Sequence, residues 1–431
     1  MKKLIKFKLK FLAKLILAKY KPKVVGITGS VGKTGTKEAV YTVLAGKFSV
    51  RRNLKNYNNE FGLPLTVIGV DSPGRSIFGW AGVFLKALGL ILFKDKKYPK
   101  ILVLEMGVDR PGDMQYLSSI VRCDIGIVTL ISHSHEEYFG SIKEIQKEKG
   151  VMIENLKPNG WTILNFDDEV TKQISEKSKA RVLTFGFKPG ASLQAQELVF
   201  SFEKNKEAAS LLGISFKLAY KGSFVPVLLP EVIGYNAIYA ALAASAVGVA
   251  MEMNLVEIAE ALRKFNSPNG RMSLIDGIKH TLIVDDSYNS SPSSTMLALD
   301  MVSKIPLARG ARRFAVLGDM LELGSYSEDG HKEVGQYAHK SGIDHLITVG
   351  ERARDIGRGA EAAGMSKDNI FEYTDVAEAG RFVQQRILHG DLIFVKGSQG
   401  MRMEKIVKEL MAEPLRAEEL LVRQGKEWDD K

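Results

Sequence analysis

The chain alternates short apolar runs with longer stretches in which apolar and polar residues mix at helical spacing. The short runs hold four to eight residues with few polar positions, and they lie at residues 101–104, 124–131, 161–164, 281–284, 313–317, 345–349 and 392–395. Runs without alternation are typical of strands covered on both faces, as in parallel sheets flanked by helices. The pattern predicts an α/β protein in which a second α/β unit begins after residues 266–270.

Three further segments have distinct patterns. Residues 197–230 alternate like antiparallel strands, and residues 234–248 are rich in small side chains, which predicts a closely packed helix. An apolar run at residues 77–93 is interrupted by Lys86 and is short for a membrane span. It predicts either a buried helix or a membrane-facing element, within an apolar insertion at about residues 75–98.

The N-terminal segment is basic and amphipathic. Residues 1–23 hold nine lysines and no acidic residue, so they account for nearly all of the net charge of +10. The rest of the chain is close to neutral, which argues against nucleic acid as a partner. At helical spacing four lysines share one side and four apolar residues share the other: Lys3, Lys6, Lys10 and Lys14, and Ile5, Leu9, Leu12 and Ile16.

Two interpretations of this segment remain open. It is too rich in lysine to span a bilayer and lacks the uninterrupted apolar core of a signal peptide. It favours an interfacial helix on an anionic membrane. Together with the apolar 77–93 segment it would dock there, anchored by residues such as Leu9, Leu12 and Trp80. In the alternative, residues 4–17 pack with residues 77–93 on the protein's own body.

Residues 24–34 read VVGITGSVGKT, which is a buried strand, a glycine-rich turn and the start of a helix. Gly29 and Gly32 allow the backbone to approach an anion, and the N–H groups at the helix start point towards it. Lys33 can reach terminal phosphates, and the Thr34 hydroxyl can ligate Mg²⁺. Ile27 stands where the common pattern has glycine, which marks a narrower subtype. The alternative is a tight turn with an incidental lysine.

Polar residues follow several predicted strands, at the edge where parallel sheets bind ligands. Glu105 ends one strand and suits Mg²⁺, although it could instead cap a helix or form a salt bridge. His135 follows the next strand, and a lone histidine is more often structural. Lys149 lies on the following helix and by itself resembles a solvated lysine. Three other clusters could equally be caps and turns: residues 285–289, 318–324 and 396–398.

Ten short motifs occur in order between residue 23 and about residue 411. They are TGSVGKT (28–34), NYNNEFGLPLT (56–66), EMG (105–107), SHEEYFGS (134–141), NFDD (165–168), GYN (234–236), GR (270–271), DDSYNSSP (285–292), GDMLELG (318–324) and VKGS (395–398). Together they resemble the Mur ligase family, ATP-dependent amide-forming enzymes of peptidoglycan synthesis. Ordered agreement of many motifs is far more specific than any one of them. The DDSYN and GDMLELG pieces favour the member that adds D-alanyl-D-alanine to a muramyl tripeptide.

The resemblance implies a site for ATP and Mg²⁺. The implied ATP contacts are Gly29, Ser30, Gly32, Lys33, Thr34, Asn236, Arg271 and Asp286. The implied metal ligands are Thr34, Glu105, His135 and Lys149, and the implied catalytic residues are Lys33, Lys149 and His135. Lys149 matches the family's carbamylated lysine, fourteen residues after the histidine. The implied reaction is carboxylate attack on the γ-phosphate, which gives an acyl phosphate, followed by displacement of phosphate by an amine.

The resemblance also implies a domain division. Residues 1–22 form the basic segment, residues 23–267 the central P-loop domain with a mainly parallel sheet, and residues 268–431 a Rossmann-like C-terminal α/β domain. We expect the family's N-terminal nucleotide-sugar-binding domain to be absent, because about 22 residues precede the first strand. Three substitutions depart from the family pattern: Tyr235 for a histidine, Tyr239 for an asparagine and Gln399 for an arginine.

We therefore expect an ATP-dependent peptide ligase that uses ATP, Mg²⁺, a cell-wall peptide precursor and D-alanyl-D-alanine or a similar amine. One alternative is the same chemistry on another or lipid-linked carboxylate. The other is a non-catalytic nucleotide-binding membrane scaffold, which the joint presence of Glu105, His135 and Lys149 disfavours. The single cysteine, Cys123, excludes a disulfide framework. We expect a cytoplasmic monomer with peripheral contact at the inner face of the membrane.

Overall fold

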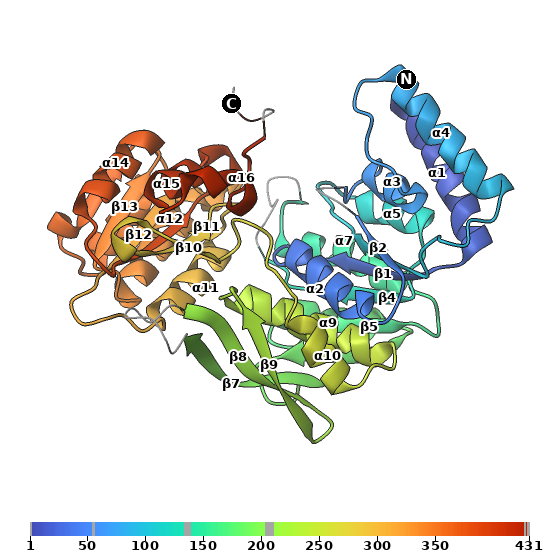
Figure 1. The fold of residues 1–431 in the computed structure, drawn as a ribbon, viewed down its shortest axis with the longest axis horizontal. Coiled ribbons are helices and arrows are strands. Elements are labelled where there is room, and N and C mark those ends of the chain that lie inside the picture. Colours follow the sequence, from blue (N-terminus) through green and yellow to red (C-terminus); the bar gives the residue numbers. More distant parts are fainter. Residues whose placement is uncertain (1, 54–56, 133–138, 203–210, 426–427, 429–431) are drawn as a thin grey trace. The chain divides into compact units, whose positions relative to one another are not determined.

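The computed structural model describes residues 2–53, 57–132, 139–202, 211–425 and 428. The chain divides into two compact units, whose elements are drawn in Figure 1. The first contains Met1–Leu198, Phe216–Leu228 and Asn236–Phe265, and the second contains Val199–Ser215, Leu229–Tyr235 and Asn266–Lys431.

The larger sheet is mainly parallel and has the strand of the glycine loop, β1, in its interior. In the described part of the chain it has nine strands, in the order β2-β3-β1-β4-β5-β6-β7-β8-β9. Their bounds are β1 Lys23–Thr28, β2 Val50–Arg52, β3 Ile101–Glu105, β4 Ile125–Val128, β5 Trp161–Asn165, β6 Arg181–Gly186, β7 Leu193–Phe202, β8 Leu211–Tyr220 and β9 Ser223–Pro230. β1 pairs in parallel with β3 on one side and β4 on the other. The predicted mainly parallel sheet is confirmed.

Helices cover both faces of this sheet. They are α1 Lys2–Tyr20, α2 Lys33–Ala45, α3 Gly62–Ile68, α4 Ile77–Leu92, α5 Asp113–Ile120, α7 Ile142–Glu154, α8 Glu169–Lys172, α9 Tyr235–Ala250 and α10 Leu255–Leu262. Because strand side chains alternate between faces, Val24, Leu102 and Leu164 share one core with α5 and α7. On the other face α2 and α9 approach closely, and a Cβ on Gly248 of α9 would lie 3.3 Å from the Val43 side chain of α2.

α1 and α4 run side by side as a further layer outside α3 and α5 (Figure 1). Leu9 and Ile16 of α1 are completely buried and share one core with Val83 and Ala87 of α4. Burying a side chain such as Leu9 stabilises a fold by about 1.5–3 kcal/mol, so the inner faces hold both helices in place. The alternative in which these segments pack on the protein's own body is confirmed for these inner faces.

Of the predicted membrane anchors, Leu9 is wrong. Leu9 is buried, and Leu12 and Trp80 are partly buried against the same core. The reason is that these side chains lie on the inner faces, which cover α3 and α5. Among the described helices, none combines the length and apolar character needed to cross a bilayer.

Polar contacts also fasten α1 to its neighbours. The Nζ atoms of Lys6 and Lys10 lie 4.1 and 4.5 Å from the ring centroid of Tyr116 on α5. At the other end of α1, Lys19 Nζ donates to three backbone carbonyl oxygens at the end of α4, at 2.8–2.9 Å. The Tyr20 hydroxyl donates to two of the same oxygens. A cation at this helix end satisfies carbonyls that have no partner within the helix. Because the C-terminal ends of α1 and α4 meet here, the two helices run in the same direction.

The second unit is built on a sheet of six strands in the described residues, in the order β10-β11-β15-β12-β13-β14. The strands are β10 Ser273–Asp276, β11 Leu282–Asp286, β12 Arg313–Gly318, β13 His345–Val349, β14 Ile370–Tyr373 and β15 Leu392–Lys396. Only β10 is antiparallel to its neighbour among these pairs. The predicted second α/β sheet is confirmed.

The helices of the second unit pack closely. They are α11 Pro292–Ser303, α12 Ser327–Lys340, α13 Arg354–Ala362, α14 Val376–Arg386, α15 Glu404–Leu410 and α16 Ala417–Leu420. α14 and α15 share a core with Phe314 and Ile393 of the sheet. α12 and α13 touch backbone to backbone, because a Cβ on Gly335 would lie 1.9 Å from the carbonyl oxygen of Ile356.

Replacing this glycine should separate the two helices. We expect Gly335→Ala to lower the free energy of unfolding by about 1–3 kcal/mol, since the added methyl group has no space. The control is Gly380→Ala on α14, where a Cβ would make only ordinary contacts from 3.6 Å. That variant should be neutral or gain about 0.5–1 kcal/mol from its better helix propensity. Urea unfolding measures both, and equal effects would contradict the close crossing.

Candidate active site

The glycine loop between β1 and α2 is shaped by glycine conformations and by the end of β4. Gly29 has φ +145° and Gly32 has φ +86°, values that side chains disfavour. A Cβ on Gly29 would lie 2.0 Å from Oγ1 of Thr129. The Ser30 N–H donates to the Leu130 carbonyl oxygen at 2.6 Å, which ties the loop to the chain after β4. The two glycines have no side chain to obstruct an anion, so this backbone fits a bound phosphate.

Lys33 and Thr34 are the first two residues of α2. The Lys33 ammonium curls back over the loop and donates to the carbonyl oxygens of Gly29 at 2.7 Å and Ser30 at 3.3 Å. This cation therefore lies beside the N-terminus of α2, where the helix dipole also favours an anion. The loop fits the phosphates of ATP. Thr34 directly follows Lys33, and its hydroxyl could ligate the metal ion that binds together with these phosphates.

Lys149 reaches the same loop from α7. Its side chain is only 2% exposed, and its Nζ donates to the carbonyl oxygen of Gly29 at 3.2 Å. Burial, and then the charge of Lys33, hold the pKa of Lys149 well below its usual value of 10.5. Asp109 and Glu148 act in the opposite direction. A lowered pKa favours the neutral amine, the form that adds to CO₂, so the site suits a carbamate. The alternative of a solvated lysine is wrong.

Glu105 ends β3, directly beside β1, where its register partner is Ile27. Its side chain is 5% exposed, and its Oε1 accepts a hydrogen bond from Asn58 Nδ2 at 3.1 Å. Asn53 accepts from the Glu105 N–H at 2.9 Å and donates to its carbonyl oxygen at 3.2 Å. Asn58 therefore holds the carboxylate of Glu105, and Asn53 holds its backbone. Asn58 lies in one of the ordered motifs, but the sequence pattern assigned neither asparagine this role.

The predicted metal ligands are brought together only in part. Thr34 and Glu105 follow neighbouring strands and Lys149 reaches the same loop, whereas His135 lies outside the described residues. Among the described residues, no three histidine, cysteine or acidic side chains gather into a metal site. Mg²⁺ nevertheless fits hydroxyl and carboxylate oxygens, because it is usually held by one or two protein ligands together with substrate phosphates.

Asn236 and Tyr239 lie on the first turns of α9, near the end of β5. Asn236 is half-buried at the second position of the helix. The Tyr239 hydroxyl donates to Asp167 Oδ2 at 2.9 Å, and the same carboxylate accepts from the N–H groups of Phe187 at 2.6 Å and Lys188 at 3.0 Å. Tyr239, which replaces an asparagine of the family pattern, thus supports the loop after β6.

In the second unit, Asp286 and Lys396 end the paired strands β11 and β15 in register. Lys396 Nζ donates to Asp286 Oδ2 at 2.5 Å and to the carbonyl oxygen of Asn289 at 2.9 Å. Burial raises the pKa of Asp286, and the charges of Lys396 and Arg271 oppose that rise. The Arg271 guanidinium lies 4.0 Å from the ring centroid of Tyr288. Arg271 and Asp286 are thus part of one cluster.

The GDMLELG and VKGS motifs meet at the same edge of this sheet. The Leu321 N–H donates to Ser398 Oγ at 2.8 Å, and the Ser398 N–H donates to the Asp319 carbonyl oxygen at 3.0 Å. The Met320 N–H donates to Nε2 of buried His331 at 2.9 Å. His331 belongs to no recognised motif, so its support of this loop was not predicted.

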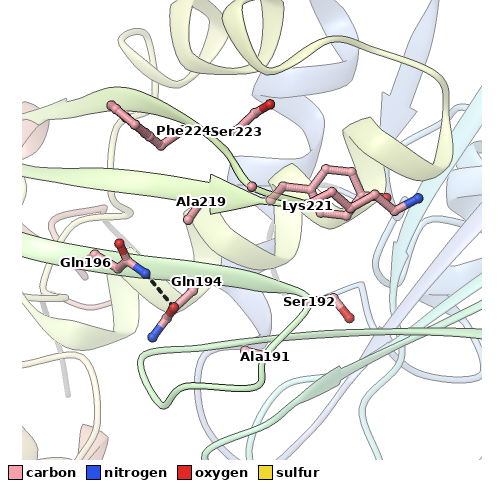
Figure 2. A pocket seen from close by; sticks show the side chains of 10 residues that line it. Ala191, Ser192, Gln194, Gln196, Ala219, Lys221, Ser223 and Phe224 are labelled. Atoms are coloured by element: carbon pink, nitrogen blue, oxygen red, sulfur yellow. Dashed lines mark hydrogen bonds between the residues drawn. The ribbon is translucent and has the colours of Figure 1, made fainter.

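A cavity of about 340 Å³ in the first unit is lined by none of these residues. Its lining consists of Ala191, Ser192, Gln194, Gln196, Ala219, Tyr220, Lys221, Gly222, Ser223 and Phe224. Figure 2 shows Gln196 bonded to Gln194 on the same strand, with Lys221 at the turn between β8 and β9 and Phe224 on β9. This cavity therefore has no part in the predicted phosphate site, and a glycine loop binds phosphate through its backbone without needing an enclosed cavity.

A phosphate loop at the carboxyl end of a parallel sheet, with a buried lysine and carboxylate beside it, defines a nucleotide-binding P-loop protein. Sequence comparison narrows this class. The Mur ligase middle domain matches residues 86–248, and the domain described as Mur ligase, glutamate ligase domain, matches residues 270–399. The UDP-N-acetylmuramoyl-tripeptide–D-alanyl-D-alanine ligase of Bacillus subtilis is 30% identical over 404 residues, which cover 94% of this chain and 79% of the relative. The chain belongs to the Mur ligase family.

Other comparisons agree with this assignment. The Escherichia coli enzyme of the same name is 28% identical over 389 residues, which cover 90% of this chain and 76% of that enzyme. The crystal structure of the MurF ligase from Thermotoga maritima in complex with ADP has a TM-score of 0.76 and 26% identity, and the match covers 94% of this chain and 83% of that one.

The low pKa of Lys149 gives a stability test in CO₂-free buffer. The folded protein binds the Lys149 proton more weakly than the unfolded chain, so stability rises with pH between the lowered pKa and 10.5. The destabilisation of the fold by the buried Lys149 ammonium is complete below the folded-state pKa and is absent above 10.5. We expect Lys149→Met to be more stable than the parent at neutral pH, with a difference that shrinks as the pH rises.

Urea unfolding across this pH range measures the difference. Lys179→Met, at an exposed lysine of the same unit, is the matched control and should change little at any pH. A difference that stays constant with pH would contradict the lowered pKa.

Proposed function

We propose that this protein is an ATP-dependent ligase that joins D-alanyl-D-alanine to a UDP-linked muramyl tripeptide in peptidoglycan precursor synthesis. The observation that carries the proposal is the convergence of Lys33 and Lys149 on the Gly29 carbonyl oxygen, beside the carboxylate of Glu105. The names of the relatives from Bacillus subtilis and Escherichia coli support the choice of substrates. The ADP complex of the Thermotoga maritima enzyme supports ATP as the nucleotide.

The proposed roles follow from charge. Gly29, Ser30 and Gly32 would contact the phosphates, Gly29 and Gly32 through their backbone N–H groups, and the Lys33 ammonium would neutralise charge as the γ-phosphate passes to the substrate carboxylate. The acyl phosphate then loses phosphate to the incoming amine. Thr34 and Glu105 would hold Mg²⁺, which supplies further neutralisation of phosphate charge when bound. These roles, and that of His135, are proposals.

A carbamate at Lys149 would turn the second cation of the site into an anion that can ligate a metal. The change matters because a lysine amine carries no negative charge, whereas a carbamate at Lys149 would attract both the Lys33 ammonium and a metal ion. Asn236, Arg271 and Asp286 are proposed as the remaining ATP contacts.

We propose the boundaries 23–267 for the ATP-binding domain and 268–431 for the C-terminal domain, with residues 1–22 and the insertion at about 75–98 as accessory elements. A cytoplasmic location, a monomeric state and peripheral contact with an anionic membrane belong to the same proposal. The basic amphipathic character of α1 supports the membrane contact.

The function is tested by phosphate release from ATP over a panel of muramyl peptides, with and without D-alanyl-D-alanine. We expect turnover to need both the tripeptide and the dipeptide. Lys33→Ala and Glu105→Ala should each lower turnover by about 10²–10³-fold with an unchanged unfolding transition, because each removes charge stabilisation from the transition state. Lys179→Ala is the surface control. Near-normal turnover in either site variant, or turnover indifferent to the dipeptide, would overturn the proposal.

The carbamate is tested separately. Lys149→Ala should lose turnover, and short carboxylates added to the assay should restore part of it by supplying the missing anion. The same carboxylates should not rescue Lys33→Ala, since that variant lacks a cation. Lys149→Ala with full activity, or rescue of both variants alike, would rule the carbamate out.

A further inference from the structure

The outer faces of α1 and α4 carry apolar side chains that no part of the described chain covers. Phe78 is 91% exposed and Phe7 is 68% exposed, which is far from the usual burial of phenylalanine. The exposed residues repeat at helical spacing on each helix: Leu4, Phe7, Phe11 and Leu15 on α1, and Phe78, Leu85, Leu88 and Leu92 on α4. The two helices run side by side (Figure 1), and the exposed residues of their two stripes are here called the α1–α4 face.

The two helices cannot hide this face by turning. Their opposite faces are already occupied, with Ala13 and Ile16 of α1 and Val83 of α4 buried in the core of the first unit. Lys19 and Tyr20 also bond the end of α1 to the last carbonyls of α4. Each helix therefore has two apolar stripes, one used by the protein and one directed outward.

Positive charge surrounds the α1–α4 face. Lys8 and Lys14 of α1 are exposed beside it, and Lys86 of α4 is exposed with its ammonium bonded to the Gly69 carbonyl oxygen at 2.8 Å. At the two ends of α4 the exposed charged residues are mainly basic: Asp71, Arg75, Lys94, Asp95, Lys96 and Lys97. An apolar surface bordered by lysine and arginine has the composition of a helix that lies within the headgroup region of a membrane.

We propose that the α1–α4 face binds the surface of an anionic membrane, with its phenylalanine and leucine side chains among the acyl chains and its lysines at the phosphate headgroups. A second copy of the chain fits this face poorly, because a symmetric contact would bring each row of lysines against its equivalent. The proposal specifies the membrane contact suggested above, and it stands or falls independently of the ligase reaction.

The test uses the full chain and vesicles of phosphatidylcholine with or without phosphatidylglycerol. Wild type should co-sediment with the anionic vesicles at low salt and much less with pure phosphatidylcholine. The triple variant Phe7→Ser, Phe78→Ser, Leu85→Ser should bind at least about tenfold more weakly, because it removes apolar surface that enters the bilayer. The matched control replaces three exposed apolar residues elsewhere, Val256→Ser, Leu388→Ser and Leu415→Ser, and should bind like wild type.

A charge pair of variants separates the electrostatic part. Lys8→Glu with Lys14→Glu should weaken binding and flatten its salt dependence, because two headgroup contacts become repulsive. Lys179→Glu with Lys264→Glu alters two exposed lysines outside both helices and should leave binding unchanged. Circular dichroism and ATP-dependent phosphate release check that every variant is folded.

Three results would overturn the proposal. They are wild type that ignores anionic vesicles at low salt, a triple variant that binds as well as its control, and a concentration-dependent dimer that the triple variant abolishes without any vesicle binding. Phosphate release from soluble substrates should be equal in wild type and all these variants. Loss of vesicle binding with normal turnover therefore separates failure of this proposal from failure of the proposed reaction.

Discussion

The carbonyl oxygen of Gly29 accepts hydrogen bonds from two ammonium groups, and the first unit is organised around this contact. Lys33 arrives from α2 at 2.7 Å and Lys149 from α7 at 3.2 Å, so the helices on opposite faces of the sheet meet at one loop atom. Burial, and then the nearby charge of Lys33, disfavour the ammonium form of Lys149 and lower its pKa. The loop is thereby prepared for an anion, whether a phosphate or a carbamate.

The second unit arranges its buried charges differently. Asp286 is paired with Lys396, and Glu404 is completely buried between Arg402 and Arg423 at 2.6 and 2.7 Å. Burial alone would raise the pKa of Glu404, but hydrogen bonds from the two arginines lower it. Removing one partner from such a buried pair typically costs about 3–5 kcal/mol. In the second unit, these charges therefore also hold the strand ends and the C-terminal segment together.

Strands buried on both faces were predictable, because β3, β12, β13 and β15 are uninterrupted apolar runs. The edge strands β2 and β14 were missed, since an edge position tolerates the polar residues of VRR and IFEY. Lys33 and Glu105 were also predictable, because the phosphate loop has a fixed motif and Glu105 stands at the end of a predicted strand. Asn53 and His331 act through partners remote in sequence or on another element, so no local pattern marks them. Helical spacing predicted a single apolar side on α1. Phe7 belongs to a second apolar stripe, which the sequence analysis did not distinguish from the first.

α1 is joined to β1 by Lys21 and Pro22 alone. Lys21 has φ +48° and its N–H donates to Leu17 at the end of the helix, while the proline ring fixes the next backbone angle. β1 then runs directly into the phosphate loop. A long flexible linker would allow that loop to move relative to α1, but this two-residue connection keeps the loop at a fixed distance from the helix. If α1 lies on a surface, the short connection fixes the distance and orientation of the phosphate loop relative to that surface. A substrate that stays attached to the same surface must then be long enough to reach the loop.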